Sequence, residues 1–143
     1  IINSFITFAV MEKVNPQTDN LIYVVDDDPV ITGLVTARLE AAGYMVRSYA
    51  YAEECLASLE GELPDLIILD FFFFKDGETP MNGMEAYDEI TRVAPEIPVI
   101  MLSAQEKGEV VLEFARKGIA DYVIKDTDLI DNLQMSVKEV LER

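Results

Sequence analysis

The most informative absence in this sequence of 143 residues is histidine, of which there is none. Catalysis through an imidazole and metal sites rich in histidine are therefore excluded. Cysteine is almost as scarce. Cys55 stands alone, so no intramolecular disulfide can form, and we expect a reducing compartment, the cytoplasm. Because Cys55 lies in a helical pattern, we interpret it as a small buried hydrophobic residue rather than a reactive thiol.

Positive charge is also in short supply. The chain has 11 Lys and Arg residues against 27 Asp and Glu residues, a net charge of −16 at pH 7. A surface this acidic repels nucleic-acid phosphates and anionic lipids, so we expect neither direct nucleic-acid binding nor membrane binding. The same excess of carboxylates favours a divalent cation as ligand.

Long apolar runs are missing as well. The apolar start IINSFITFAV (1–10) is far too short to span a bilayer, and it lacks the basic start and the cleavage site of a signal peptide. We expect residues 1–19 to be an N-terminal extension that is non-native or partly disordered, with Met11 as a candidate natural start. Residues 20–143 contain no repeat, linker or low-complexity tract and are predicted to form one domain.

What the sequence does contain is an alternation of short apolar runs and stretches with helical periodicity. The runs are rich in β-branched and aliphatic residues, which is typical of parallel strands buried on both faces. The alternation predicts a doubly wound α/β fold, a five-stranded parallel sheet with helices on both sides. The predicted strands are 21–25, 44–49, 66–69, 99–102 and 122–124. The first predicted helix begins at Pro29 and ends before Gly43, and the other four cover 52–59, 83–93, 108–117 and 128–142.

Helical spacing also predicts which side chains of the helices face the core. For the last helix, Asp126 or Thr127 is predicted to be the N-cap. The side chains predicted to lie on the inner faces are Val30, Leu34, Ala37 and Leu39, then Met84, Tyr87, Ile90 and Val93, then Val111, Leu112 and Ala115, and finally Leu129, Leu133, Val137 and Leu141.

Polar residues follow four of the five predicted strands. Asp26 and Asp27 follow the first, Asp70 the third, Ser103 the fourth and Lys125 the fifth. Ligands of open parallel sheets bind at the carboxyl ends of the strands, so we expect these side chains to share one pocket. Clustered carboxylates suit a hard cation such as Mg²⁺, while a lysine and a hydroxyl suit a bound phosphoryl group. A carboxylate beside Mg²⁺ can act as a nucleophile toward phosphorus.

Four segments at these strand ends, VVDDDP, DLIILD, PVIMLSAQ and DYVIKD, resemble the signature of bacterial response-regulator receiver domains and occur in the same order. The resemblance covers residues 20–143. It implies a flavodoxin-like sheet with strand order 2-1-3-4-5 and a phosphoacceptor switch of a two-component phosphorelay. It implies no enzyme beyond the domain's own phosphotransfer and dephosphorylation. The implied partner is a sensor histidine kinase or a phosphotransfer protein. The fourth and fifth predicted helices offer apolar side chains beyond those the core needs, so a second copy of the chain, in a homodimer, is a further candidate partner.

The resemblance also implies a role for each residue of the acidic site. Asp70 would receive the phosphoryl group from a histidine kinase or a small-molecule donor. The Mg²⁺ ligands would be Asp27, Asp70, the backbone carbonyl of Phe72 and, through water, Asp26. Lys125 would contact the phosphoryl group.

Two further residues would carry the signal away from the site. The resemblance makes Ser103 the switch hydroxyl and Tyr122 the aromatic residue whose rotamer reports phosphorylation. Phosphorylation would then change the face formed by the fourth helix, the fifth strand and the fifth helix, and so control an output domain or partner. Asp28 would be only the N-cap of the first helix.

The sequence departs from the family pattern in two places. Asp126 stands where the family usually has proline after the lysine, which favours a trans bond because a cis bond without proline costs about 3 kcal/mol. The segment FFFFKDGETPMNG (71–83) is longer than the usual loop and places the matching glycine at Gly83. Four consecutive phenylalanines cannot all face inward, so at least one is expected to meet a partner or line the site.

Two other functions remain open at this point. VVDDDPV also fits the pattern of haloacid-dehalogenase-like phosphatases, in which Asp26 would be the nucleophile and Asp28 the acid/base. Against this reading, the chain has no cap domain and no later acidic metal motif, and Asp70 would have no role. The other alternative is an interaction module that works without phosphorylation.

Overall fold

The computed structural model of the chain describes residues 20–72, 81–104 and 108–143. Within these residues the predicted doubly wound sheet and its strand order are confirmed, since the five parallel strands lie in the order β2-β1-β3-β4-β5. The predicted extension, 1–19, lies outside the described residues. The strands are β1 (Leu21–Val25), β2 (Met45–Tyr49), β3 (Leu66–Asp70), β4 (Val99–Ser103) and β5 (Asp121–Ile124).

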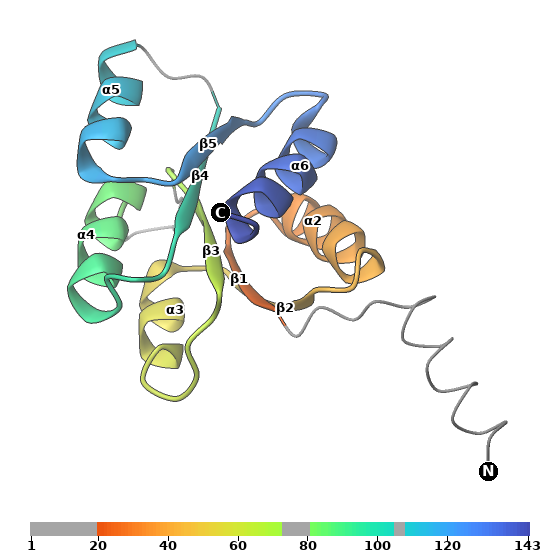
Figure 1. Cartoon of the computed structure of the whole chain (residues 1–143), viewed down its shortest axis with the longest axis horizontal. Coiled ribbons are helices and arrows are strands. Elements are labelled where there is room, and N and C mark those ends of the chain that lie inside the picture. The colour runs from red at the N-terminus through yellow and green to blue at the C-terminus, as the bar shows by residue number, and fades with distance from the viewer. Residues whose placement is uncertain (1–19, 73–80, 105–107) are drawn as a thin grey trace, which may run out of the picture.

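Helices cover both faces of the sheet (Figure 1). On one face lie α2 (Pro29–Ala41) and α6 (Leu129–Leu141), and on the other lie α3 (Ala52–Ser58), α4 (Gly83–Val93) and α5 (Gly108–Lys117). In the described part of the chain, no helix is long and apolar enough to cross a membrane.

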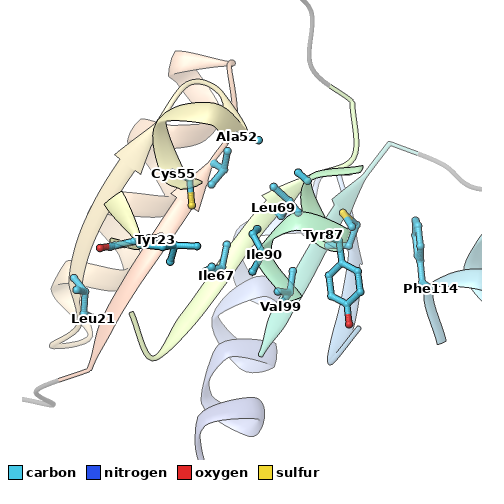
Figure 2. Packing of buried hydrophobic residues seen from close by; sticks show 14 residues of the cluster. Leu21, Tyr23, Ala52, Cys55, Ile67, Leu69, Tyr87, Ile90, Val99 and Phe114 are labelled. Carbon is cyan, nitrogen blue, oxygen red and sulfur yellow. The ribbon is translucent and has the colours of Figure 1, made fainter. Parts of the chain in front are cut away.

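The sheet divides the hydrophobic core in two, because alternate residues of a strand point to opposite faces. On β1, Ile22 and Val24 face α2 and α6, while Tyr23 and Val25 face the other three helices. Figure 2 shows the cluster on the second side. The α2/α6 core comprises Ile22, Val24, Val35, Leu39, Leu66, Ile68, Ile100, Leu102, Val123, Leu129, Leu133, Val137 and Val140. The α3/α4/α5 core comprises Leu21, Tyr23, Val25, Ala52, Cys55, Leu59, Ile67, Leu69, Ala86, Tyr87, Ile90, Val99, Met101 and Phe114.

The strands differ in burial according to their place in the sheet. All residues of β1, β3 and β4 are buried, as predicted. The same expectation is wrong for β2, whose residues are all exposed or half-buried, and for most of β5. The reason is that β2 and β5 are the edge strands, and each pairs with only one neighbour.

The predicted inner face of α2 is also partly wrong. Val35 and Leu39, four residues apart, are buried, whereas Val30 and Leu34 are 65% and 53% exposed. Consecutive residues of a helix are about 100° apart around its axis, so the stripe set by Val35 and Leu39 turns Leu34 toward solvent. Ala37 is exposed for the same reason.

Similar corrections apply to α4 and α5, and fewer to α6. Val93, at the end of α4, is exposed, although Tyr87 and Ile90 are buried as predicted. On α5 the buried residue is Phe114, which the spacing argument missed, while Leu112 and Ala115 are exposed. The helix therefore rests on an aromatic side chain instead of the predicted aliphatic stripe. On α6 the predicted Leu129, Leu133 and Val137 are buried, whereas Leu141 is only partly buried.

The helix ends follow the expected capping chemistry in one case and depart from it in another. The Asp28 carboxylate accepts hydrogen bonds from the backbone N–H groups of Val30 and Ile31, which confirms Asp28 as the N-cap of α2. The predicted cap of α6 is wrong, because the helix begins at Leu129 and its N-cap position is Asp128. The Asp126 side chain instead accepts from the backbone N–H of Asp128 at 2.9 Å and closes a turn just before the helix.

Candidate functional site

The polar residues singled out in the sequence meet at the carboxyl ends of the central strands. In the sheet register, Val25 pairs with Leu69, and Asp70 pairs with Leu102. Ser103, one residue further along β4, pairs with Ile124 of β5. The residues that follow β1 and β5 therefore lie beside Asp70 and Ser103.

Three carboxylates form the acidic part of the site. One oxygen each from Asp26, Asp27 and Asp70 lies within 4.8 Å of the others. Asp26 and Asp70 are buried, at 2% and 3% exposure, and Asp27 is partly buried. Asp26 is held in place locally, since its Oδ1 accepts from the backbone N–H of Asp28 at 2.9 Å. Two of the three acids are thus buried, and Asp27 is partly exposed.

Lys125 joins the two buried acids. Its Nζ lies 2.8 Å from Oδ2 of Asp26 and 2.9 Å from Oδ1 of Asp70. Among the described residues no peptide bond is cis, so the Lys125–Asp126 bond is trans, as Asp126 in place of proline favours. The lysine reaches both acids from this trans backbone.

Burial and charge shift the pKa values of all three groups. Burial, with the charge of Asp26 as a second cause, raises the pKa of Asp70 to about 6. Burial also raises the pKa of Asp26, against the hydrogen bond from Lys125. Burial works to lower the pKa of Lys125, but its hydrogen bonds to Asp26 and Asp70 outweigh burial and leave that pKa raised. The site therefore holds more negative charge than one lysine neutralises.

This donor set fits a hard divalent cation. Mg²⁺ binds carboxylate oxygens, and the Asp26, Asp27 and Asp70 oxygens lie close enough together to share one ion. A cation there would offset the repulsion that raises the pKa of Asp70. In the described part of the chain, the side chains grouped closely enough to hold it are those of these three acids.

The loop that follows Asp70 is held at its C-terminal end, where Gly83 packs against the backbone that follows β3. The backbone N–H of Gly83 donates to the carbonyl of Phe71 at 2.8 Å. A Cβ on Gly83 would lie 2.6 Å from Cα of Phe71 and 2.7 Å from the carbonyl oxygen of Asp70, so only glycine fits. The position that the sequence assigned to the matching glycine is therefore a close approach to the backbone of Asp70 and Phe71. Most of the loop, 73–80, lies outside the described residues.

The run of phenylalanines divides as expected where it is described. Phe71 packs against the α3/α4/α5 core, whereas Phe72 is 63% exposed. The backbone N–H of Phe72 points to Oδ1 of Asp70 at 3.4 Å, so the chain bends back over the acid. Phe73 and Phe74 lie outside the described residues.

Of the residues assigned to signalling, Ser103 is buried and Tyr122 is half-buried. The Tyr122 ring lies in the α3/α4/α5 core, 6.1 Å from the ring of Phe114. Phe114 was missed in the sequence, although its place four residues after Val110, which packs on the same core, was a usable signal. Thr32 was missed too: its hydroxyl donates to the backbone carbonyl of Asp26 at 3.1 Å.

A doubly wound sheet with an acidic cluster, a lysine and a buried hydroxyl at its carboxyl edge defines the class of phosphoacceptor domains that work with a divalent cation. The model of the response regulator receiver domain family matches residues 22–137, and the chain belongs to this family. It is thus a receiver domain of two-component signalling, a class that interacts with histidine kinases or phosphotransfer proteins.

Known proteins of this family are similar over most of the chain. The nitrogen assimilation regulatory protein NtrX of Azorhizobium caulinodans is 34% identical over 85% of this chain and 26% of its own length. The transcriptional regulatory protein ZraR of Escherichia coli is 32% identical over 86% of this chain and 27% of its own length. The crystal structure of the receiver domain of NtrX from Brucella abortus, 31% identical, superposes with a TM-score of 0.75 over 85% of this chain and 98% of that one.

The chain spans about a quarter of the length of these curated relatives. The matches lend no support to the phosphatase alternative, in which Asp28 would be the acid/base. In the structure the Asp28 carboxylate caps α2 instead.

Proposed function

We propose that Asp70 is the phosphoacceptor of this domain and that Asp26, Asp27, Ser103 and Lys125 assist its phosphorylation. The observation that carries the proposal is the position of Asp70. It is a buried carboxylate, 2.9 Å from the lysine ammonium and within reach of two further acids.

The chemistry is a single phosphoryl transfer. A carboxylate oxygen of Asp70 attacks phosphorus, and the bond between phosphorus and the donor atom breaks, so that its electron pair leaves with the donor. The product is an acyl phosphate on Asp70. Since the sequence contains no histidine, a donor phosphohistidine must lie outside these 143 residues. Asp70 can attack only when it is ionised, which Lys125 assists.

The remaining residues stabilise charge around the transferred group. Mg²⁺, held by Asp26, Asp27, Asp70 and the carbonyl of Phe72, would supply positive charge to the phosphoryl oxygens. Lys125 would turn its ammonium from the Asp70 carboxylate to a phosphoryl oxygen, and the Ser103 hydroxyl would donate a hydrogen bond to another. This chain's contribution is the fixed placement of these donors.

We further propose that the signal leaves through Ser103 and Tyr122. Movement of the Ser103 hydroxyl toward the phosphoryl group would vacate space beside β4, and Tyr122 would turn inward. The face formed by α5, β5 and α6 would then bind a partner, such as a second copy of the chain. Phosphorylation shifts the equilibrium between the inactive and the active state only to the extent that the phosphoryl group interacts better with the active state than with the inactive one.

The wider setting is proposed on the same basis. We take 20–143 as the domain and 1–19 as an extension, and we expect the protein to act in the cytoplasm, where its free thiol at Cys55 would stay reduced. Its acidic surface argues against nucleic acid and membranes as direct partners. Apart from its own phosphotransfer and dephosphorylation, we expect no enzymatic activity.

Incubation with acetyl phosphate, followed by intact-mass measurement, tests the assignment of Asp70. The parent protein should gain the mass of one phosphoryl group with Mg²⁺ and none with a chelator. Asp70→Asn should abolish the gain, whereas Asp88→Asn, which changes an exposed acid on α4, should not affect it. Undiminished labelling of Asp70→Asn would contradict the proposal.

Two other outcomes would favour the alternatives. Turnover of small phosphate esters that disappears in Asp26→Asn would indicate a phosphatase. Neither labelling nor turnover would indicate an interaction module. For the metal, Asp27→Ala should weaken Mg²⁺ binding more than Asp26→Ala, because Asp27 is expected to bind the ion directly and Asp26 only through water.

A further inference from the structure

Phe71, the residue directly after Asp70, belongs to a row of four aromatic rings. Its ring centroid lies 4.7 Å from that of Phe72 and 5.4 Å from that of Phe114, both in edge-on arrangements. The Phe114 ring lies 6.1 Å from that of Tyr122. The row thus runs from the phosphoacceptor loop, through helix α5, to strand β5.

The backbone of Phe71 is fixed on both sides. Its N–H donates to the carbonyl of Leu102 on β4 at 2.8 Å, and its carbonyl accepts from the N–H of Gly83 on α4. Because Gly83 approaches so closely, the backbone of Phe71 has little room to shift toward α4. The residue directly after Asp70 is thus held between β4 and α4 by its backbone, and its ring contacts α5.

The partner of that ring, Phe114, is the main anchor of α5. All residues of α5 are described, and Phe114 is the only one of them that is buried. At the C-terminal end of the helix, the hydroxyl of Tyr87 donates to the carbonyl of Lys117 at 2.8 Å, and Lys117 pairs with Asp88. Toward its N-terminal end, α5 rests on Phe114 and on the half-buried Val110. In Figure 2, Phe114 stands at one end of the core cluster, apart from the other labelled side chains.

The row of rings begins beside Asp70, at a carboxylate oxygen whose bonding phosphorylation would change. Oδ1 of Asp70 receives both the Lys125 ammonium and, at 3.4 Å, the N–H of Phe72. In an acyl phosphate one carboxyl oxygen becomes an ester oxygen, which accepts hydrogen bonds poorly, and the negative charge moves to the phosphoryl group. The two donors must then redistribute, and the N–H of Phe72 belongs to the peptide that joins it to Phe71.

We infer that the contact between the rings of Phe71 and Phe114 transmits the state of Asp70 to α5. This route runs beside the one through Ser103 and Tyr122, and it rests on the proposed function of Asp70. Phe71 is a positioning residue here, since it acts on α5 through Phe114 and touches no phosphoryl donor. Both routes meet at Tyr122, whose ring faces Phe114.

The test uses beryllofluoride, a stable mimic of the phosphoryl group, with Mg²⁺ and the full chain. Fluorine NMR reports whether beryllofluoride binds, and amide proton–nitrogen spectra report the shifts of residues 108–117 on α5. The variants are Phe71→Leu and Phe114→Leu, each of which replaces a ring by a smaller apolar side chain. Tyr44→Leu is the matched control, because it removes a half-buried ring that packs against the α2/α6 core, outside the row.

In the parent, beryllofluoride should bind and shift the α5 amides. Phe71→Leu should bind beryllofluoride as the parent does, but the α5 shifts should be smaller by about twofold or more. Tyr44→Leu should keep the parent's shifts. If circular dichroism shows that Phe71→Leu is unfolded, Phe114→Leu provides the same test from the helix side.

Each failure points to a different error. Absence of beryllofluoride binding to the parent would overturn the proposed function itself. Binding with α5 shifts of parental size in Phe71→Leu and Phe114→Leu would leave the function intact and overturn the coupling route. Binding to the parent without any shift in α5 would overturn the route as well.

Discussion

Helices α5 and α6 follow β4 and β5 along the chain and lie on opposite faces of the sheet, yet they are held very differently (Figure 1). Five residues of α6 are buried, and the helix is also tied to α2 through Arg38, whose Nη1 lies 2.7 Å from Oδ1 of Asp131. On α5 the buried residue is Phe114, and one hydrogen bond and one ion pair hold the C-terminal end of the helix. Helix α6 completes the α2/α6 core, whereas α5 packs on the α3/α4/α5 core through a single fully buried ring.

The difference suggests a division of labour between the two faces. Segments with few buried apolar contacts open at lower free energy than the core, and elements that move during regulation come from such segments. The rings beside α5 lead to the loop that follows Asp70, whereas α6 has buried contacts along its whole length. We therefore expect α6 to supply stability and α5 to supply movement.

The largest expected effect comes from comparing Leu133→Ala on α6 with Phe114→Ala on α5. Leu133 is 1% exposed, and its truncation should lower the free energy of unfolding by about 3 kcal/mol. Phe114 is the larger side chain, but its loss can cost no more than undocking α5 does, which we expect to be about 1 kcal/mol. Urea denaturation of both variants measures the two losses. An equal or larger loss for Phe114→Ala would remove the distinction between the helices.

The next effect concerns the stability that the folded protein loses by burying carboxylates at the acidic site. The pKa of Asp70 in the folded protein is about 6, above its ordinary value of 3.8. Protonation of Asp70 therefore stabilises the fold; this stabilisation is complete below the ordinary pKa and is lost as the pH rises through about 6. At pH 7 without Mg²⁺, the ionised carboxylate should destabilise the protein.

Asp70→Asn should accordingly raise the free energy of unfolding at pH 7 by on the order of 2 kcal/mol in the presence of a chelator. The gain should shrink toward pH 4, where Asp70 of the parent is protonated. Asp88→Asn, at an exposed ion pair, should change stability by less than about 0.5 kcal/mol. A destabilised Asp70→Asn at pH 7 would show that Asp70 supports the fold rather than straining it.

The smallest effects should come from the ion pairs that tie the two helices to their neighbours. Arg38→Ala and Lys117→Ala each remove a partly exposed pair, with Asp131 and Asp88 respectively, and should each lower the free energy of unfolding only slightly. Hydrogen exchange should differ between them. Lys117→Ala should speed exchange throughout α5, whereas Arg38→Ala should leave α6 protected, because α6 keeps its buried residues. Faster exchange of α6 in Arg38→Ala would mean that α6, like α5, depends on an ion pair at its surface.

Much of the fold could be predicted from the sequence because the signals were local. Apolar runs located all five strands, and Gly43 and Pro29 marked the ends of α2. The faces of α2 and α5 were harder, because a helical stripe can be drawn through several sets of apolar residues. Only the packing shows that Val35 and Phe114, rather than Leu34 and Leu112, meet the core.

The candidate site, too, could be predicted only in part from the sequence. The strand-end rule brought Asp26, Asp27, Asp70 and Lys125 together correctly, because the register of a parallel sheet aligns the ends of its strands. The row of rings from Phe72 to Tyr122 could not be predicted, since it joins a loop, a helix and a strand by tertiary contact. The departure at Asp126 did not prevent Lys125 from reaching both acids.

Hydrogen exchange of the unmodified protein, with and without Mg²⁺ and beryllofluoride, tests the central claim most directly. In the free protein, the amides of α5 should exchange about tenfold or more faster than those of α6. Beryllofluoride should change exchange in α5 and in the residues next to Asp70 and leave α6 at its original rate. Exchange in α5 as slow as in α6, or a beryllofluoride response confined to α6, would contradict the account.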